Sequence, residues 1–141
     1  MKRTLIGATL AFVLATVVAS SAAPRADSIA TVSLKAVNGA ILTPTLAAIL
    51  VPHLGDSVTF EAAFANNLKN VRIQVLCYQN DALVYGMAAP WDSQFQLGGG
   101  MSAWFLNNGA ANCVADLYYW SYQGGQKFNF LATTQFDALA R

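Results

Sequence analysis

The residues that could do chemistry in this chain are few and scattered. His53 is the single histidine of the 141 residues, in the stretch V-P-H-L-G-D. With a serine and an aspartate it could form a hydrolase triad, but no G-x-S-x-G nucleophile motif accompanies it. We therefore interpret His53 as a turn residue ahead of Gly55 and Asp56, and we predict no catalytic residue.

Metal binding and glycoside hydrolysis find equally little support. A zinc site needs several histidine or cysteine ligands. Asp81 and Asp92 fall in predicted loops, but without the D-x-D-x-D-G spacing of a calcium loop. Glu61, the only glutamate, is predicted on the outward face of a strand, which leaves no pair of carboxylates for glycoside hydrolysis. Asp116, also outward, is interpreted as a charge that deters strand aggregation. We expect no metal and no cofactor.

The chain contains two cysteines, Cys77 and Cys113. In an exported protein an even number of cysteines indicates a disulfide, and two cysteines allow only one pairing within a chain. Such a bond would stabilise the fold by roughly 4 kcal/mol on the chain-entropy model. Free thiols and a bridge between two chains are the alternatives.

The first residues predict export from the cell. Lys2 and Arg3 precede an uncharged stretch, Leu5 to Ala19, and small residues follow. This order is typical of a secretory signal peptide, and the stretch is too short for a comfortable membrane span. We predict a signal peptide over residues 1–22, cleaved after Ala22, and one mature domain over residues 23–141 that is secreted or held at the cell surface. A retained N-terminal anchor helix is the alternative.

Charge excludes one class of partner. The chain has 8 basic and 7 acidic residues, and they are spread along the sequence. Nucleic acids and anionic membranes are bound by basic patches, and the sequence has none. The low charged fraction, 11%, instead favours surfaces that contact other surfaces.

Alternating apolar residues predict an all-β fold. The period is two in residues 57–64, 71–79 and 112–120, and it places Cys77 and Cys113 on the inward faces of their strands. Weaker strand signals lie at 31–37, 82–86, 95–97, 102–106 and 127–136, with Gly and Asn turns between them. Residues 71–79 and 82–86 form a predicted hairpin, and residues 44–54 a short helical turn ended by Pro52. Seven or eight short strands indicate a two-sheet antiparallel sandwich.

The stretches G-D-S-V-T-F-E-A-A-F, V-R-I-Q-V-L-C-Y-Q-N-D-A-L-V-Y and A-N-C-V-A-D-L-Y-Y resemble the middle and late strands of immunoglobulin-like sandwiches. The resemblance covers most of residues 31–136 and implies an immunoglobulin-like fold of about seven strands. Two features depart from it. Ala111 stands where the tyrosine corner would need a tyrosine, and Trp91, at a spacing suited to the buried core tryptophan, falls in a predicted loop.

The aromatic residues are the remaining functional signal. Alternation places Tyr119 in the core, and Tyr118 and Trp120 on the outward face. Tyr78, Tyr118, Trp120 and Tyr122 would gather on one exposed sheet face if strands 71–79 and 112–120 are neighbours, with Trp91 and Trp104 as secondary candidates. Exposed aromatics supply rigid contact area for proteins, glycans or copies of the same subunit. Alternatively, they are strand-forming residues that another segment covers.

These features predict a secreted, non-enzymatic sandwich that binds or assembles at the cell surface, as an adhesive, structural or fibre-type subunit. The apolar segment 27–50 could pair with the sheet of a neighbouring subunit. A small-ligand or carbohydrate-binding module that uses Trp91, Trp104 and Trp120 is the second reading. A secreted hydrolase or inhibitor is the third.

Overall fold

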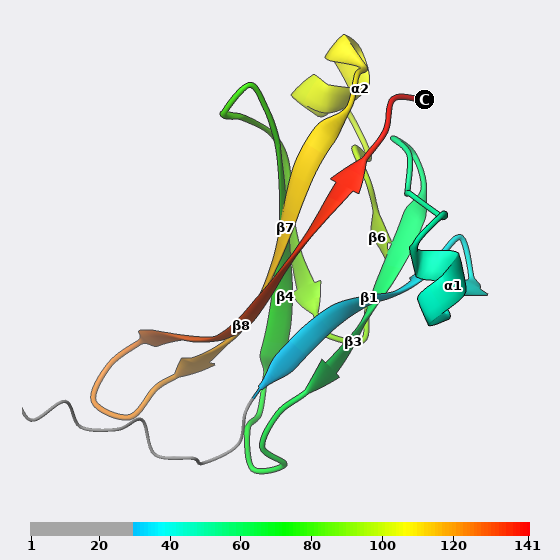
Figure 1. Cartoon of the computed structure of the whole chain (residues 1–141). Coiled ribbons are helices and arrows are strands. Elements are labelled where there is room, and N and C mark those ends of the chain that lie inside the picture. The colour runs from blue at the N-terminus through cyan, green and yellow to red at the C-terminus, as the bar shows by residue number, and fades with distance from the viewer. Residues whose placement is uncertain (1–29) are drawn as a thin grey trace, which may run out of the picture.

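The computed structural model describes residues 30–141, which form two four-stranded antiparallel sheets packed as a β-sandwich (Figure 1). The strand order is β2-β1-β3-β6 in one sheet and β5-β4-β7-β8 in the other. The predicted all-β sandwich is confirmed. The strands are β1 (Thr31–Val37), β2 (Ala40–Ile41), β3 (Ser57–Ala63), β4 (Val71–Gln79), β5 (Ala82–Pro90), β6 (Phe95–Gln96), β7 (Ala111–Ser121) and β8 (Lys127–Ala138).

The core lies between the two sheets and is built by the alternation seen in the sequence. In β4, Ile73 and Val75 are fully buried, and in β7 Ala115 and Leu117 are fully buried. The residues between them in each strand point to the outer face, where Gln74 and Asp116 are partly exposed. Burying one face of each strand in this way fixes the register, because a slip of one residue would turn the apolar set to solvent.

The predicted disulfide between Cys77 and Cys113 is present, and it lies within one sheet. The two cysteines face each other directly across the β4–β7 pair, with Cα atoms 4.1 Å apart. Immunoglobulin domains of antibodies instead carry a bridge between the two sheets. The chain therefore shares the sandwich architecture with those domains but differs from them in this covalent link.

Residues 102–106, predicted as a strand, form a helix instead. Helix α2 (Ala103–Asn107) begins at Ser102, whose hydroxyl accepts a hydrogen bond from the backbone N–H of Phe105 at 3.1 Å. It ends at Asn108, which adopts a positive φ of 54°. A serine N-cap and an Asn-Asn-Gly end are sufficient to define one short helix, and a run of only five residues is too short for periodicity to separate the two structures.

The predicted hairpin and helical turn are both present with changed lengths. Asn80 and Asp81 adopt positive φ angles, as a tight two-residue hairpin turn requires, and β5 continues to Pro90 rather than ending at residue 86. Helix α1 (Pro44–Ala47) is capped by Thr43 and is shorter than the predicted segment 44–54.

The N-terminal segment pairs within its own chain. β1 lies beside β3, from Thr31 opposite Ala63 to Val37 opposite Val58. Residues 31–37, which belong to the segment 27–50 expected to pair with a neighbouring subunit, therefore have strand partners within their own chain. Residues 27–29 and the predicted signal peptide, residues 1–22, lie outside the described residues.

Candidate binding surface

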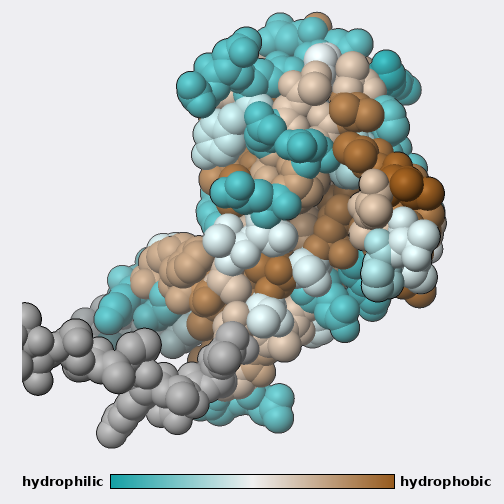
Figure 2. Space-filling model, viewed as in Figure 1, coloured by the Kyte–Doolittle hydropathy of each residue, from teal (hydrophilic) through white to brown (hydrophobic). Residues whose placement is uncertain are grey.

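The β7–β8 hairpin extends away from the body of the sandwich, at the lower left of Figure 1. We call its outer part, residues 118–130, the arm. It comprises the end of β7, the turn with Gly124 and Gly125 at positive φ, and the start of β8. In the space-filling view the same arm projects from the lower left of the body of the sandwich (Figure 2). A hairpin that leaves the body in this way can place its side chains against another molecule.

Four aromatic side chains gather on the outward face of the arm. We call Tyr118, Trp120, Phe128 and Phe130 the arm aromatics. Phe128 stacks on Tyr118 with ring centroids 4.9 Å apart, and Trp120 meets Phe128 edge-on at 5.4 Å. Phe130 lies opposite Tyr118 in the strand register and is exposed. Offset-stacked and edge-on pairs are the arrangements that aromatic rings prefer, so the cluster is a rigid surface.

The predicted faces of Tyr118 and Trp120 are correct, but Tyr118 is not exposed. The stacked ring of Phe128 and the neighbouring Trp120 leave Tyr118 only 6% exposed. Tyr119, on the other face, is only half-buried, although it packs against the core as predicted. The exposed part of the cluster is supplied by Phe128 and Phe130, which are not among the predicted binding residues. Their signal was the alternation in K-F-N-F, which puts both rings on one face.

A β-bulge aligns these side chains. Leu117 pairs with Ala132, but the next residue, Tyr118, pairs with Phe130, so Leu131 has no partner in the ladder. Leu131 and Ala132 both pack against the core. The extra residue shifts the alternation of β8 by one, so that Phe128 and Phe130 share the face of Tyr118 and Trp120.

The structure does not bring Tyr78 and Tyr122 into the cluster. Tyr78 is paired with Asn112, whereas Tyr118 is paired with Arg72, six residues along β4. This separation is about 20 Å, since a strand rises about 3.3 Å per residue. Neighbouring antiparallel strands thus hold the two tyrosines on one sheet face but at its opposite ends. Tyr122 is exposed just beyond the end of β7.

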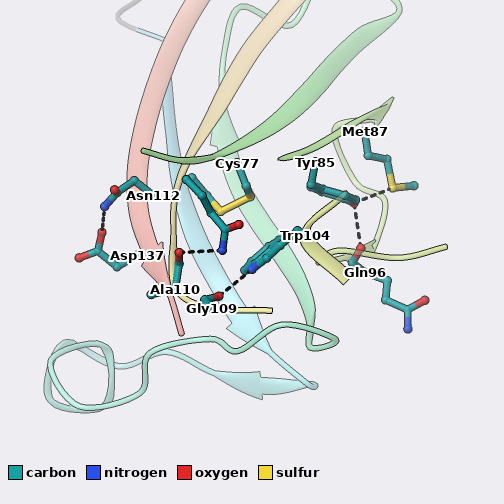
Figure 3. The surroundings of a disulfide bond; sticks show 11 residues. Cys77, Tyr85, Met87, Gln96, Trp104, Gly109, Ala110, Asn112 and Asp137 are labelled. Atoms are coloured by element: carbon teal, nitrogen blue, oxygen red, sulfur yellow. Dashed lines mark hydrogen bonds between the residues drawn. A yellow bond between two sulfur atoms is a disulfide. The ribbon is translucent and has the colours of Figure 1, made fainter. Parts of the chain in front are cut away.

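The other two candidate tryptophans face inward. Trp104 has no exposed surface, lies near the disulfide, and donates its indole N–H to the carbonyl of Gly109 at 2.8 Å (Figure 3). Trp91 is half-buried, with its ring edge-on to Phe64 at 5.6 Å. The proposed surface role of Trp104 is therefore corrected: it is a core residue, because α2 turns its side chain inward.

Tyr85, on β5, is buried and has a raised pKa. Its hydroxyl donates to the carbonyl of Gln96 at 2.8 Å, beside Met87 (Figure 3). Burial disfavours the phenolate and raises the pKa of Tyr85 from 10.0 to about 12. The side chain is therefore a neutral hydrogen-bond donor inside the protein.

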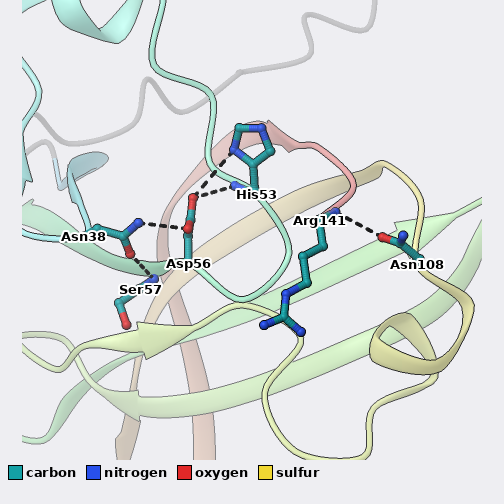
Figure 4. Close-up of polar contacts among 6 residues, drawn as sticks. All are labelled: Asn38, His53, Asp56, Ser57, Asn108 and Arg141. Atoms are coloured by element: carbon teal, nitrogen blue, oxygen red, sulfur yellow. Dashed lines mark hydrogen bonds and ion pairs between the residues drawn. The ribbon is translucent and has the colours of Figure 1, made fainter.

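His53 belongs to a network that shapes a turn (Figure 4). The carboxylate of Asp56 accepts from the backbone N–H of His53 and from the side-chain amide of Asn38, both at 2.8 Å. The imidazole Nδ1 lies 3.7 Å from the same carboxylate. Ser57 takes part through its backbone N–H, which donates to Asn38. The contacts agree with the interpretation of His53 as a turn residue.

Residues 30–141 contain neither a metal-binding cluster nor a helix that could span a membrane. No group of three or more His, Cys, Asp or Glu side chains there could hold a metal ion. Neither helix in this part of the chain has the length and apolar character needed to cross a membrane. Comparisons of the chain with protein-family models, with curated proteins and with solved structures find no match.

Proposed function

We propose that this protein is an exported, non-enzymatic β-sandwich that binds a partner or assembles with itself at the cell surface through the arm aromatics. The observation that carries the proposal is the cluster on the protruding hairpin, with Phe128 45% exposed and Phe130 55% exposed. Large apolar rings held rigidly outside the body of a protein are typical of contact surfaces.

The arm also carries few charged side chains that would favour its exposure to solvent. Lys127 is the only charged residue between Leu117 and Ala132. Charged residues are depleted in the centre of protein interfaces, where aromatic residues are enriched. The composition of the arm is therefore that of an interface centre rather than of an ordinary solvated hairpin.

Export is the second part of the proposal. It is supported by the signal-peptide pattern in residues 1–22 and by the Cys77–Cys113 disulfide, since disulfides persist mainly in oxidising compartments. Kinship with immunoglobulin-like sandwiches is proposed only at the level of architecture, which many cell-surface domains share.

A glycan is the second candidate ligand. The three tryptophans first considered for sugar binding do not form one surface, because Trp104 is buried and Trp91 packs on Phe64. Any sugar site would therefore lie on the arm, where Trp120 and Phe128 present aromatic surface.

The test compares two variants of the mature protein. Phe128→Ser with Phe130→Ser removes the exposed rings of the arm. Phe105→Ser is the matched control, since Phe105 on α2 is similarly exposed, at 48%. Light scattering over a range of concentrations measures self-association, and tryptophan fluorescence with a glycan panel measures sugar binding.

We expect the arm variant to lose the association or binding that wild type and Phe105→Ser retain. If the arm variant associates and binds as wild type does, the arm is not the contact surface. A fluorescence change with a sugar, in a protein that stays monomeric, would favour the glycan over a protein partner.

A further inference from the structure

The chain contains two asparagine–glycine pairs, and both lie in turns. Asn38-Gly39 joins β1 to β2, and Asn108-Gly109 follows α2. Both asparagines are exposed, and an alanine follows each pair, so the two local sequences are closely matched. In such a pair the backbone nitrogen of the glycine can attack the side-chain amide of the asparagine, since glycine has no Cβ to hinder the approach. The geometry of each turn decides how readily the two atoms meet.

Asn38 is held away from this reaction. Gly39 also has a positive φ, so the pair forms a type I′ turn, in which the ψ of Asn38 is about +30°. At that angle the nitrogen of Gly39 lies across the Cα–C bond from the asparagine side chain. The Asn38 amide also donates to Asp56 at 2.8 Å and accepts from the backbone N–H of Ser57 at 2.9 Å (Figure 4). Attack on Asn38 therefore requires the turn to open and both bonds to break.

Asn108 has a backbone conformation that brings the reacting atoms to the same side. Its φ of 54° and ψ of −163° are a combination that residues other than glycine rarely adopt. At this ψ the nitrogen of Gly109 lies on the same side of the Cα–C bond as the asparagine Cβ. No hydrogen bond to another described residue engages the Gly109 N–H, so none has to break before the nitrogen attacks.

A hydrogen bond also polarises the amide of Asn108. Its side-chain oxygen accepts from the backbone N–H of Arg141 at 3.0 Å (Figure 4). Negative charge develops on this oxygen when the amide carbon becomes tetrahedral, and a donor that already points at the oxygen stabilises that state. The fold therefore supplies Asn108 with both the approach of the nucleophile and a donor for the oxyanion.

We propose that Asn108 is a site of intramolecular deamidation, at which the folded chain converts asparagine to aspartate and isoaspartate while Asn38 is spared. The Gly109 nitrogen loses its proton and bonds to Cγ of Asn108, the Cγ–Nδ2 bond breaks, and ammonia leaves with that proton. Water then opens the five-membered succinimide at either carbonyl, which gives an aspartyl or an isoaspartyl residue. Water is the only co-reactant.

Conversion of Asn108 changes the turn at the core end of β7. The backbone carbonyl of Asn108 accepts from the side chain of Gln79 at 2.7 Å, and the carbonyl of Gly109 accepts from Trp104 at 2.8 Å. An isoaspartyl residue lengthens the main chain between these two positions by one carbon, so the two bonds cannot both keep their geometry. Aged protein should therefore unfold at a lower denaturant concentration than fresh protein.

The experiment compares the two pairs within one molecule. The mature protein, with its disulfide intact, is incubated at neutral pH, and peptide mass spectrometry follows deamidation at Asn38 and Asn108 over weeks. The same measurement in guanidinium chloride is the matched control, because the unfolded chain presents both pairs as N-G-A. Asn108→Gln is the second control, since glutamine keeps an amide but would have to close a six-membered ring.

We expect Asn108 to react at least about tenfold faster than Asn38 in the folded protein, because two ordinary hydrogen bonds must break at Asn38 alone. In guanidinium chloride the two rates should be similar. Asn108→Gln should abolish the reaction at residue 108 and leave that of Asn38 unchanged, and the comparison within wild type stands without this variant.

Two results would overturn the inference. One is a ratio of the two rates in the folded protein that equals the ratio in the unfolded chain or favours Asn38. The other is a folded protein in which Asn108 stays intact while the unfolded chain reacts. The reaction does not involve the arm, so neither result bears on the proposed function.

Discussion

Side chains alternate between the inner and outer faces of the sheet at both ends of β7, but one end is buried in the core and the other forms a surface. At the Cys113 end, the inward residues meet the second sheet, and Trp104 of α2 lies fully buried near the disulfide. At the Tyr118 end, the hairpin leaves the sandwich, and its large side chains gather on the outer face against Phe128. The first end is held by burial, and the second is a surface held by ring stacking.

The two ends differ in whether another layer of the protein covers the strand. An aromatic residue stabilises the fold where another layer removes it from water, and it offers contact area where no layer does. Trp104 and Trp120 illustrate the two cases. Substitutions at the first end should therefore change stability, and substitutions at the arm should change association.

The largest effect is expected at Trp104. Trp104→Ala leaves a cavity in the core and removes the hydrogen bond to Gly109, so the free energy of unfolding should fall by about 3–5 kcal/mol. Urea unfolding measures it. Trp120→Ala is the matched control on the arm and should cost about 1 kcal/mol. Equal losses for the two tryptophans would abolish the distinction between the two ends.

Removal of the disulfide should cost nearly as much. The double variant Cys77→Ala, Cys113→Ala should lose about 4 kcal/mol, since the bond constrains the unfolded chain. Urea unfolding of wild type in the presence of a reductant provides the control and should show a similar loss. An unfolding midpoint that does not respond to reductant would mean that the bond adds no stability to the core end.

Tyr85 should make stability depend on alkaline pH. Its folded pKa is about 12 and its ordinary value is 10.0, so both states keep the proton below pH 10. Between pH 10 and 12 the unfolded chain loses the proton first, and stability should fall by up to about 3 kcal/mol.

Tyr85→Phe should remove this part of the alkaline loss. At pH 7 the variant should cost about 1 kcal/mol through the lost hydrogen bond to Gln96. Urea unfolding at pH 7, 10 and 11.5 measures both effects. An equally steep alkaline loss in wild type and variant would assign the loss to other groups.

The smallest effect on stability is expected on the arm. Phe130→Ser removes an exposed ring, so the free energy of unfolding should change by less than about 1 kcal/mol. Thermal unfolding measures it, with wild type beside the variant. A loss as large as that of Trp104→Ala would show that the arm is part of the core.

The sequence correctly predicted those parts of the fold in which apolar and polar residues alternate over a long stretch. In β4 and β7 the alternation extends over nine or more residues, and it correctly predicted the strands, their inward faces and the disulfide. It did not reveal that the two cysteines share a sheet, because strand order depends on long-range pairing that no local pattern encodes. Helix α2 was wrongly predicted as a strand because its five residues are too few to show a helical period.

The candidate site was predicted only in part. Tyr118 and Trp120 were placed on the correct face, but the register with β8 decides which rings meet, and that register includes the bulge at Leu131. A hollow of about 290 Å³ between β1, the α1 region and the end of β8 was not predicted either. Its walls come from β1, the α1 region and β8, and only folding brings Leu42 and Phe136 together.

The bridge between His53 and Leu139 has a consequence for how the protein folds. The backbone N–H of Leu139 donates to Pro52 and its carbonyl accepts from Leu54, so the residue directly after β8 holds a segment from the first half of the chain. Contacts so distant in sequence slow folding, because the loop must close before they form. A chain emerging from its N-terminus can pair β4 with β5 early, but Pro52 and Leu54 gain these hydrogen-bond partners only when residue 139 has arrived.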